Sequence, residues 1–367
     1  MSTPLFHPLT VRSIEPDTAE AVVVSFEVPP ALRETFGFTQ GQYLTLRQTI
    51  DGQDLRRSYS ICAGVDDGEI RVGVRQVRGG VFSTWINTHL KPGDTVQVMA
   101  PQGRFFVPIE PASARHHVGI AGGSGITPIL SIMKTVLARE PKSRFTLVYG
   151  NRSLQSTMFK EELEDLKNRY MTRLVLHHVF SDEPTDAPLN HGLLNRDKLG
   201  EFLASVMPGA GIAHAYICGP FTMNDEAQAA LLAAGVPTER IHIERFGVAP
   251  GAAGEAAAAG VGAVVHQAQP GDAEAARIAI IRDGLRREFD FRHQQPSILD
   301  AASAAGLGVP FSCTSGVCGT CRAKLIEGEV RMERNFALEP AEVAAGFVLC
   351  CQAHPRSAKV VLSFDER

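Results

Sequence analysis

The segment Phe311-Ser-Cys313-Thr-Ser-Gly-Val-Cys318-Gly-Thr-Cys321 holds three of the seven cysteines, and Leu349-Cys350-Cys351 follows it. The first three cysteines have the spacing C-x4-C-x2-C. Thiolates at this spacing, together with one distant cysteine, ligate a [2Fe–2S] cluster. Gly316 and Gly319 lack a Cβ, so backbone N–H groups can approach the sulfur atoms there. The segment therefore predicts an iron–sulfur domain in the C-terminal part of the chain.

The sequence also suggests which cysteines bind the iron. We expect Cys313, Cys318, Cys321 and Cys351 to be the ligands, and Cys350 is the competing candidate for the fourth position. Cys351 is preferred because its distance from Cys321 matches the plant-type ferredoxin spacing. The alternative is a structural zinc site with four cysteines. Such sites favour two C-x2-C pairs, whereas this chain has one.

Composition narrows the class of protein. The chain has 367 residues, 44% hydrophobic and 21% charged, with a net charge of −4. These values are ordinary for a multidomain globular protein and do not point to nucleic acid. No apolar run is long enough to cross a membrane, and the first residues lack the layout of a signal peptide. We expect a cytoplasmic protein whose cysteines serve as metal ligands rather than as disulfides.

Three patterns of predicted secondary structure divide the chain into domains. Residues 1–110 alternate short strands with turns, as in 21–28 and 69–75, and predict an antiparallel β-barrel. Residues 111–246 alternate strands (117–121, 145–149, 173–180, 214–218) with helices (128–139, 157–169, 196–206, 222–234), which predicts a doubly wound parallel sheet. Residues 247–275 are rich in Gly and Ala and indicate a linker, or a helical turn at 255–259. Residues 276–367, with a hairpin at 277–292 and a helix near 297–305, form the predicted cysteine-bearing α+β domain.

Two segments of the barrel resemble the flavin motifs of the ferredoxin–NADP reductase superfamily. Arg56-Arg-Ser-Tyr-Ser60 matches its R-x-Y-S pattern, and Gly79-Gly-Val-Phe-Ser83 matches its G-x-x-S phosphate loop. On a strand, Arg57 and Tyr59 share a face, so the guanidinium can pair with pyrophosphate while the ring covers the flavin. Two pyrophosphate contacts favour FAD over FMN. The candidate FAD residues are Arg57, Ser58, Tyr59, Ser60, Gly80, Val81, Phe82 and Ser83.

A glycine-rich turn follows the strand at 117–121. Gly122-Gly-Ser-Gly-Ile-Thr-Pro128 opens a helix, with Pro128 in its first turn and Thr127 as the expected N-cap. Such a turn cradles a pyrophosphate, and it resembles the G-G-S/T-G-x-T-P motif of the same superfamily. Cys218-Gly-Pro220 resembles its C-G-P motif, which implies a place beside the nicotinamide. The candidate nucleotide residues are Gly122, Gly123, Ser124, Gly125, Thr127, Pro128, Cys218, Gly219 and Pro220.

The end of the second strand of this domain indicates the coenzyme. The segment Tyr149-Gly-Asn151-Arg152-Ser153 contains no acid, and NAD enzymes often place one there to bind the ribose. We therefore expect Asn151, Arg152 and Ser153 to bind the 2′-phosphate of NADPH, which is favoured over NADH. The alternative interpretation of Arg152 is a solvated surface side chain.

The order of the three domains resembles the phthalate dioxygenase reductase-like layout over the whole chain. Segments 55–62, 148–152, 217–220, 244–246, 332–335 and 338–349 also resemble the reductase subunits that serve phenylacetyl-CoA epoxidase. The departure is Cys350, where relatives usually carry a small hydroxyl residue. The resemblance implies a β-grasp ferredoxin domain. It also implies that Ser60 hydrogen-bonds the flavin and that Cys218 lies at the nicotinamide. Phe246 is a candidate to cover the flavin.

This resemblance implies a function. We expect electrons to pass from NADPH to FAD, to the [2Fe–2S] cluster and then to a separate di-iron oxygenase. The alternative within the class is a reductase for an aromatic-ring dioxygenase or another monooxygenase. A redox sensor without turnover is the alternative from another class. We expect no nucleic-acid or membrane partner.

Overall fold

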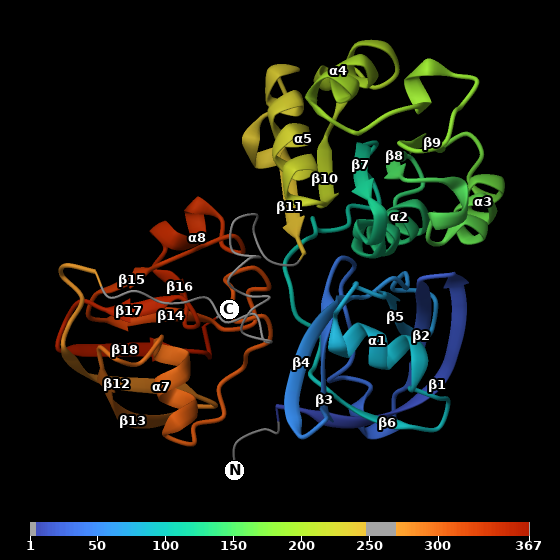
Figure 1. Cartoon of the computed structure of the whole chain (residues 1–367). Coiled ribbons are helices and arrows are strands. Elements are labelled where there is room, and N and C mark those ends of the chain that lie inside the picture. The colour runs from blue at the N-terminus through green and yellow to red at the C-terminus, as the bar shows by residue number, and fades with distance from the viewer. Residues whose placement is uncertain (1–4, 247–268, 367) are drawn as a thin grey trace. The chain divides into compact units, whose positions relative to one another are not determined.

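The computed structural model describes residues 5–246 and 269–366 (Figure 1). They form two compact units. The N-terminal unit comprises residues 8–246, and the C-terminal unit comprises residues 269–366 together with residues 5–7. Most of the predicted linker, with the alanine-rich stretch 255–259, lies outside the described residues. The remainder, 269–275, belongs to the C-terminal unit, where Asp272 and Arg331 form an ion pair of 2.7 Å with both side chains nearly buried.

The first half of the N-terminal unit is the predicted antiparallel barrel. Its six strands have the order β4-β3-β6-β1-β2-β5. A bridge between Ile61 and Val72 brings the residue after β4 against β5, so the two edge strands meet. The strands are β1 (His7–Thr18), β2 (Ala21–Glu27), β3 (Tyr43–Ile50), β4 (Gln53–Ser60), β5 (Ile70–Arg75) and β6 (Thr95–Val98). Helix α1 (Val81–Thr88) packs on the barrel through the buried Phe82 and Ile86.

The second half of the N-terminal unit is a five-stranded parallel sheet of order β11-β10-β7-β8-β9. The chain runs outward from β7 to β9 and then returns to β10 on the other side of β7. This reversal creates a switch point at the carboxyl ends of β7 and β10, where ligands of such folds bind. The strands are β7 (His116–Gly122), β8 (Arg144–Asn151), β9 (Leu174–Phe180), β10 (His214–Gly219) and β11 (Ile241–Arg245).

Helices cover both faces of the parallel sheet (Figure 1). Residues of α2 (Ile126–Arg139) and α3 (Lys160–Arg169) form one core with the sheet residues Leu147 and Tyr149. Residues of α4 (Arg196–Ser205) and α5 (Phe221–Ala233) form the opposite core with Val118 and Val148. Short 3-10 helices occupy Pro30–Leu32, Gly123–Gly125, Leu154–Ser156, Pro188–Asn190, Gly209–Gly211 and Thr238–Arg240.

Two local predictions in this sheet were wrong. Thr127 is not the N-cap of α2, because the helix begins at Ile126 and Gly125 is its N-cap. The Thr127 hydroxyl instead donates to the carbonyl of Ser124 at 3.0 Å. Helix α3 begins at Lys160 rather than at 157, because Phe159 takes a left-handed backbone conformation with φ of 57°. The N–H of Phe159 donates to Oδ1 of Asp17 at 2.9 Å.

The C-terminal unit is the predicted α+β domain. Its five-stranded sheet has the order β13-β12-β18-β14-β16, and β12 and β18 are its parallel neighbours. The predicted hairpin is confirmed by the antiparallel pairing of β12 with β13. Helix α7 (Ile298–Ala304) packs into the core of this unit, with Ser297 as its N-cap. The other elements are β12 (Ala275–Arg282), β13 (Leu285–Arg292), β14 (Arg322–Glu327), β15 (Val330–Met332), α8 (Pro340–Ala344), β16 (Phe347–Leu349), β17 (Ala353–Pro355) and β18 (Lys359–Ser363).

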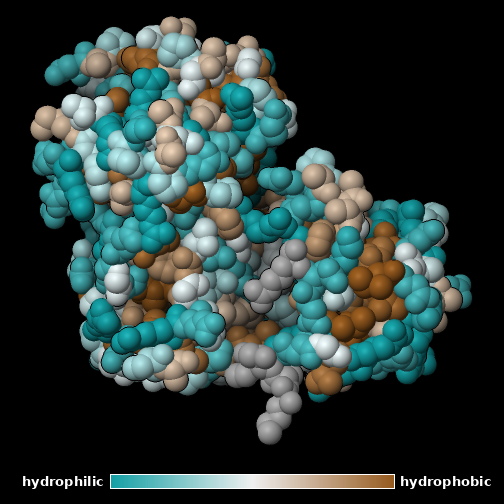
Figure 2. All heavy atoms as spheres, turned by 180° about the vertical axis from the view of Figure 1, so that it is seen from behind, coloured by the Kyte–Doolittle hydropathy of each residue, from teal (hydrophilic) through white to brown (hydrophobic). Residues whose placement is uncertain are grey.

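The face drawn in Figure 2 is mostly polar, with local hydrophobic areas. In the C-terminal unit the exposed large apolar side chains include Leu285, Ile326 and Val343. No helix in the described part of the chain is both long and apolar enough to span a membrane.

Candidate cofactor and nucleotide sites

The glycine-rich turn after β7 is built from close backbone contacts. A Cβ added to Gly125 would overlap the carbonyl oxygen of Cys218. Gly123 has a φ of +53°, which favours glycine. The hydroxyl of the buried Tyr149 donates to the carbonyl of Gly123 at 3.0 Å and fixes the turn from below. These contacts fix the turn at the start of α2, where backbone N–H groups can bind a phosphate.

The C-G-P motif lies directly beside this turn. Residue Cys218 pairs with Ala121 across β10 and β7, so the two motifs leave the sheet together. A Cβ on Gly122 would stand 2.7 Å from Sδ of Met223 and 2.8 Å from Cδ of Pro220. The structure thus brings together the predicted residues 122–128 and 218–220 at the switch point.

The predicted 2′-phosphate residues follow β8, the next strand along. Gly150 pairs with Gly122, so Asn151 ends the neighbouring strand level with the start of the glycine-rich turn. The Arg152 side chain is 55% exposed, and its Nη2 donates to Oε2 of Glu20 at 3.0 Å. Arg152 is therefore a largely exposed side chain with one ion pair to the barrel. Ser153 is the N-cap of the 3-10 helix that follows.

Strand β4 carries the predicted flavin residues in alternation. Arg57 and Tyr59 lie on one face of the strand, and Ser58 and Ser60 lie on the other. The Arg57 Nη1 donates to the carbonyl of Arg56 at 2.7 Å. The ring centroids of Tyr59 and Phe82 lie 6.2 Å apart. Burial raises the pKa of the Tyr59 phenol well above its usual range. The R-x-Y-S strand and the Gly79–Ser83 loop are therefore neighbours.

That loop is closed by Ser83. Its Oγ accepts from the Val77 N–H at 3.0 Å and donates to the carbonyl of Gly80 at 3.4 Å. A Cβ on Gly80 would stand 2.8 Å from the same oxygen, so a larger residue would displace the Ser83 hydroxyl. Gly80 is the N-cap of α1, and the first-turn N–H groups of Val81 and Phe82 are the ones that a helix leaves free for an anion.

Ser60 has a partner that the sequence did not predict. Its Oγ donates to Oε2 of Glu244 on β11 at 3.1 Å. Burial raises the pKa of the Glu244 carboxyl to about 8, although the Ser60 hydrogen bond opposes this shift. Burial and the nearby Glu244 carboxyl raise the pKa of the Cys218 thiol well above its usual range. Ser60, Cys218 and Glu244 thus form one cluster that is largely uncharged at neutral pH. Phe246, two residues after Glu244, is partly buried and packs against the core that α2 and α3 form with the sheet.

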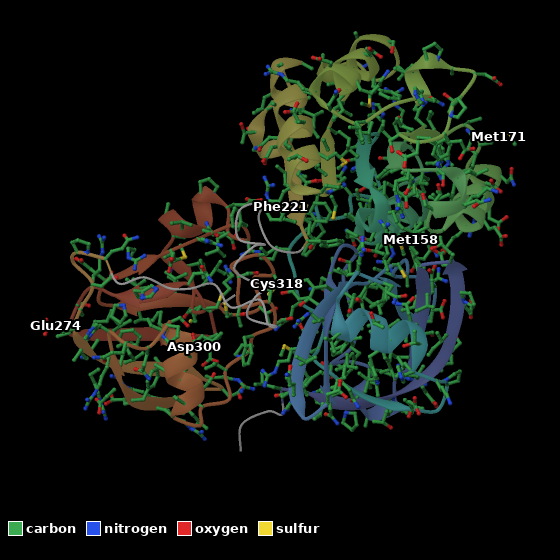
Figure 3. All side chains as sticks on the ribbon, in the orientation of Figure 1. Met158, Met171, Phe221, Glu274, Asp300 and Cys318 are labelled. Carbon is green, nitrogen blue, oxygen red and sulfur yellow. The ribbon has the colours of Figure 1, made fainter. Side chains whose placement is uncertain are left out.

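The cysteine loop of the C-terminal unit, which contains the Cys318 labelled in Figure 3, directs backbone N–H groups at sulfur. The N–H groups of Ser315 and Cys318 donate to Sγ of Cys313 at 3.4 and 3.3 Å. The N–H of Cys351 donates to Sγ of Cys321 at 3.4 Å. Gly316 and Gly319 have φ of +79° and +70°, as a tight loop with left-handed turns requires. Such N–H···S bonds favour thiolate sulfur and tune the potential of a cluster.

The cysteine side chains form two pairs. The side chain of Cys313 interacts with that of Cys318, and the side chain of Cys321 interacts with that of Cys351. Sγ of Cys318 also donates to Oγ1 of Thr320 at 3.1 Å. Two such cysteine pairs fit a cluster in which each of two irons takes two cysteines. Cys350 is 1% exposed and belongs to the hydrophobic core of the unit, while its N–H and C=O bond to Cys321 and Leu299. Among the described residues, no group of three or more His, Cys, Asp or Glu side chains is arranged around one metal ion.

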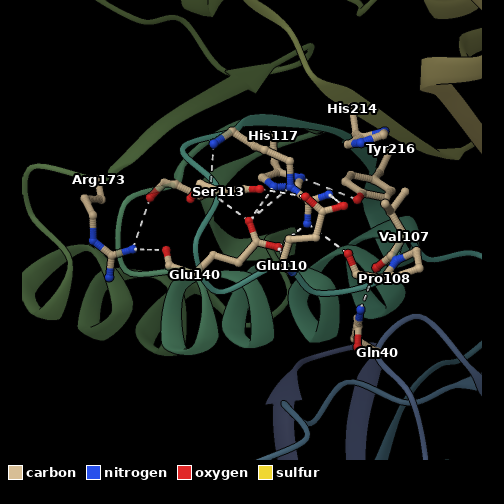
Figure 4. Close-up of polar contacts among 12 residues, drawn as sticks. Gln40, Val107, Pro108, Glu110, Ser113, His117, Glu140, Arg173, His214 and Tyr216 are labelled. Carbon is tan, nitrogen blue, oxygen red and sulfur yellow. Dashed lines mark hydrogen bonds and ion pairs between the residues drawn. The ribbon is translucent and has the colours of Figure 1, made fainter.

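A separate charged network lies at the amino ends of the strands of the parallel sheet, whereas the glycine-rich turn lies at their carboxyl ends (Figure 4). Glu140, at the end of α2, is fully buried and forms an ion pair with Arg115. Its other partners are Ser143, the N–H of Glu110 and, at 3.2 Å, Nε2 of His117. Burial alone would raise the pKa of Glu140, but these hydrogen bonds lower it to about 2. The network fixes the amino ends of the strands and lies away from the nucleotide turn.

Sequence models of three protein families match the chain. The oxidoreductase FAD-binding domain matches residues 9–107, the oxidoreductase NAD-binding domain matches 120–229, and the 2Fe-2S iron-sulfur cluster binding domain matches 280–356. One subunit of the 1,2-phenylacetyl-CoA epoxidase of Escherichia coli K12 is 42% identical over 99% of this chain and 98% of that protein. The chain belongs to the ferredoxin–NADP reductase superfamily. It is an oxidoreductase with FAD, nicotinamide nucleotide and [2Fe–2S] domains.

Other relatives of this reductase extend over its whole length. The ferredoxin reductase component of 3-ketosteroid-9-alpha-monooxygenase from Rhodococcus rhodochrous is 33% identical over 97% of the chain and 96% of its own length. The structure of phthalate dioxygenase reductase covers 98% of both chains with a TM-score of 0.58 and 24% identity, and so shows the fold. The predicted layout of three domains is therefore confirmed.

Sequence reasoning missed two acidic residues of the reductase. Glu244 begins the Glu-Arg-Phe segment that ends the nucleotide domain, but nothing in that segment indicates a bond to Ser60 on the barrel. Glu20 lies in the turn after β1, and its bonds to Arg75 and Arg152 depend on how the barrel packs on the parallel sheet. Both contacts join residues that are far apart in the sequence.

Proposed function

We propose that this reductase transfers electrons from NADPH through FAD and the [2Fe–2S] cluster to a separate di-iron oxygenase. The observation that carries the proposal is the 42% identity, over nearly the whole chain, with a subunit of the 1,2-phenylacetyl-CoA epoxidase of Escherichia coli. We assign the oxygenase component of phenylacetyl-CoA epoxidase as the partner on the same ground. The reducing cytoplasm, where thiolates persist as metal ligands, is the proposed compartment.

The residues of the barrel would hold FAD. Arg57 pairs with the pyrophosphate, and the N–H groups at the start of α1 bind its second phosphate. Tyr59 lies against the isoalloxazine, whose other face is the proposed place of Phe246. Ser58 is held by Thr45, to which its hydroxyl is hydrogen-bonded at 3.1 Å. Ser60 would place its Oγ at the flavin edge as an acceptor, because its hydroxyl proton is donated to Glu244.

The switch point would hold the nucleotide. The turn at Gly122–Gly125 binds the pyrophosphate, and Asn151, Arg152 and Ser153 bind the adenosine ribose with its 2′-phosphate. Cys218, Gly219 and Pro220 line the nicotinamide position, where the neutral thiol and the close backbone exclude water. When bound, FAD accepts a hydride from the nicotinamide, and the cluster passes electrons on singly.

The C-terminal unit would hold the cluster. We assign Cys313 and Cys318 to one iron and Cys321 and Cys351 to the other, because these are the side chains that pair. Cys350 stays in the hydrophobic core as a thiol. The amide groups that point at Cys313 and Cys321 stabilise negative charge on the ligand sulfurs.

Stopped-flow reduction with each nucleotide tests the coenzyme assignment. Flavin and cluster absorbance of the anaerobic holoprotein are followed after mixing with NADPH or NADH. Arg152→Ala should slow reduction by NADPH by roughly tenfold or more, as expected for loss of a charge-assisted bond, and should change reduction by NADH little. An equal loss with both nucleotides would remove the 2′-phosphate role of Arg152.

Reconstitution tests the partner. The purified reductase is mixed with the oxygenase component of phenylacetyl-CoA epoxidase or of 3-ketosteroid-9-alpha-monooxygenase, and NADPH consumption coupled to product is measured. Coupled turnover with the epoxidase alone supports the proposal. Coupled turnover with the monooxygenase alone would assign the reductase to another oxygenase system.

A further inference from the structure

Glu20 is held by its backbone at the edge of the proposed nucleotide site. It lies in the turn between β1 and β2, where its N–H donates to Oγ1 of Thr18 at 3.2 Å. Its carbonyl accepts from the Gln76 N–H at 2.7 Å. The side chain therefore projects from a fixed point on the barrel rather than from a free loop.

One carboxylate oxygen of Glu20 contacts two arginines. Oε2 accepts from Nη2 of Arg152 at 3.0 Å and from Nη2 of Arg75 at 3.2 Å. Arg152 follows β8 at the proposed 2′-phosphate position. Arg75 ends β5, and its Nη1 lies 3.1 Å from the place of a Cβ on Gly123, in the pyrophosphate turn. One anionic oxygen between two guanidinium groups is the arrangement that a phosphate oxygen adopts with arginines.

We propose that Glu20 is a specificity-determining residue that competes with the 2′-phosphate of NADPH for Arg152. The inference rests on the proposed role of Arg152 in binding that phosphate. NADPH must displace the carboxylate from Arg152, whereas NADH carries no 2′-phosphate and leaves this ion pair in place. Release of Arg75 towards the pyrophosphate favours both nucleotides alike. Glu20 therefore reduces the advantage of NADPH over NADH.

The exposure of the three side chains determines how much Glu20 can weaken NADPH binding. Glu20 is 54% exposed, Arg152 55% and Arg75 35%. Ion pairs this exposed are weak, since water and salt screen them, and removing one changes a binding constant by about two- to fivefold. An incoming phosphate can therefore displace the carboxylate.

The test measures binding as well as turnover on the intact protein with FAD and cluster. Calorimetric titration with NADP⁺ and NAD⁺ gives dissociation constants, and KM for NADPH and NADH gives the kinetic counterpart. Glu20→Gln should tighten NADP⁺ binding about two- to fivefold more than NAD⁺ binding, and the difference should shrink in high salt. Glu15→Gln is the matched control, because Glu15 is an exposed carboxylate on β1, the strand that leads into this turn, and accepts from Oγ of Ser13. It should change neither constant.

The double variant Arg152→Ala/Glu20→Gln completes the experiment. With Arg152 absent, Glu20→Gln should no longer favour NADP⁺ over NAD⁺. If Glu20 instead orients Arg152 for the phosphate, Glu20→Gln will weaken NADP⁺ binding, which overturns the inference.

The two proposals fail in different ways. A selective loss of NADP⁺ affinity in Arg152→Ala, without any change in Glu20→Gln, overturns the role of Glu20 and leaves the coenzyme assignment standing. An equal loss of both nucleotides in Arg152→Ala overturns the coenzyme assignment and the inference that rests on it.

Discussion

Ser60 Oγ donates to Glu244 Oε2 at 3.1 Å, although the two residues lie 184 positions apart in the sequence. The bond connects the last residue of β4 on the barrel with β11, the last strand of the parallel sheet. It places a carboxyl group that holds its proton at neutral pH at the proposed meeting point of flavin and nicotinamide. The two halves of the N-terminal unit therefore build that point together.

The raised pKa of Glu244, about 8, predicts a pH-dependent contribution to stability. Folding favours the protonated carboxyl, so its contribution is present below the unfolded pKa near 4.5 and is lost as pH rises through 8. The free energy of unfolding of the wild type, relative to Glu244→Gln, should fall by roughly 1–3 kcal/mol between pH 5 and pH 9. Urea unfolding at a series of pH values measures this difference. A constant difference across the range would show that Glu244 is ionised throughout.

The two adjacent cysteines should behave differently on substitution. Cys351→Ser removes a proposed ligand and should give protein with little cluster absorbance and a changed paramagnetic signal after reduction. Cys350→Ser changes a buried core side chain, so the cluster should remain while stability falls by roughly 1–3 kcal/mol, the cost of burying a hydroxyl. Iron analysis and paramagnetic resonance of anaerobically prepared variants decide between them. The reverse pattern would make Cys350 the ligand.

The buried Glu140 network should dominate the stability of the parallel sheet. Glu140→Gln leaves Arg115 without its fully buried partner and should cost roughly 3–5 kcal/mol, measured by urea unfolding. Asp66→Asn is the control, because Asp66 pairs with Arg139 at the surface, where both side chains are about half exposed. Its cost should be at most about 1 kcal/mol. Equal costs would show that burial of the pair has no effect.

The same network predicts acid sensitivity. Burial lowers the pKa of His117 to about 4, against the opposing effect of Glu140. Folding favours the neutral imidazole, so stability is present above the unfolded pKa near 6.5 and is lost as pH falls through 4. The melting temperature should therefore drop between pH 6.5 and pH 4, and His117→Gln should reduce that drop. An unchanged drop in the variant would assign the acid sensitivity to other groups.

Gly125 offers a direct test of the nucleotide turn. A Cβ at this position would overlap the backbone of Cys218, so Gly125→Ala should separate the turn from the C-G-P motif. Binding of both NADP⁺ and NAD⁺ should weaken by roughly tenfold or more, as in other cases of misplaced binding groups. Gly200→Ala is the control, because Gly200 lies within α4 with open space around it. That change should leave nucleotide binding intact and raise stability by about 0.5–1 kcal/mol.

Local motifs and periodicity predicted the barrel, the parallel sheet and the α+β domain, and the family resemblance implied the β-grasp fold of the last. The turn at Gly122–Gly125 could be predicted because its chemistry lies within one strand, turn and helix. The N-cap of α2 was misplaced because a threonine at the second position of the helix gives the same sequence signal as a cap. The start of α3 was misplaced because the left-handed Phe159 is held by Asp17, a contact with the barrel.

Glu20 and Glu244 could not be predicted as site residues, because their contacts are also made between the barrel and the parallel sheet. Glu20 and Glu244 resemble ordinary surface acids in a strand or turn. Their roles come from the packing of the barrel against the parallel sheet, which brings each beside a residue from the other half. Only a structure supplies such pairs.

The Glu140 network and the glycine turn occupy opposite edges of one parallel sheet. Substitutions around Arg152, the residue proposed to bind the 2′-phosphate, therefore leave the buried Glu140–Arg115 ion pair at the amino ends of the strands unchanged. On that proposal, the coenzyme could change by a few substitutions around Arg152 without compensating mutations in this network. The residues that stabilise the sheet are thus separate from the residues proposed to select the coenzyme.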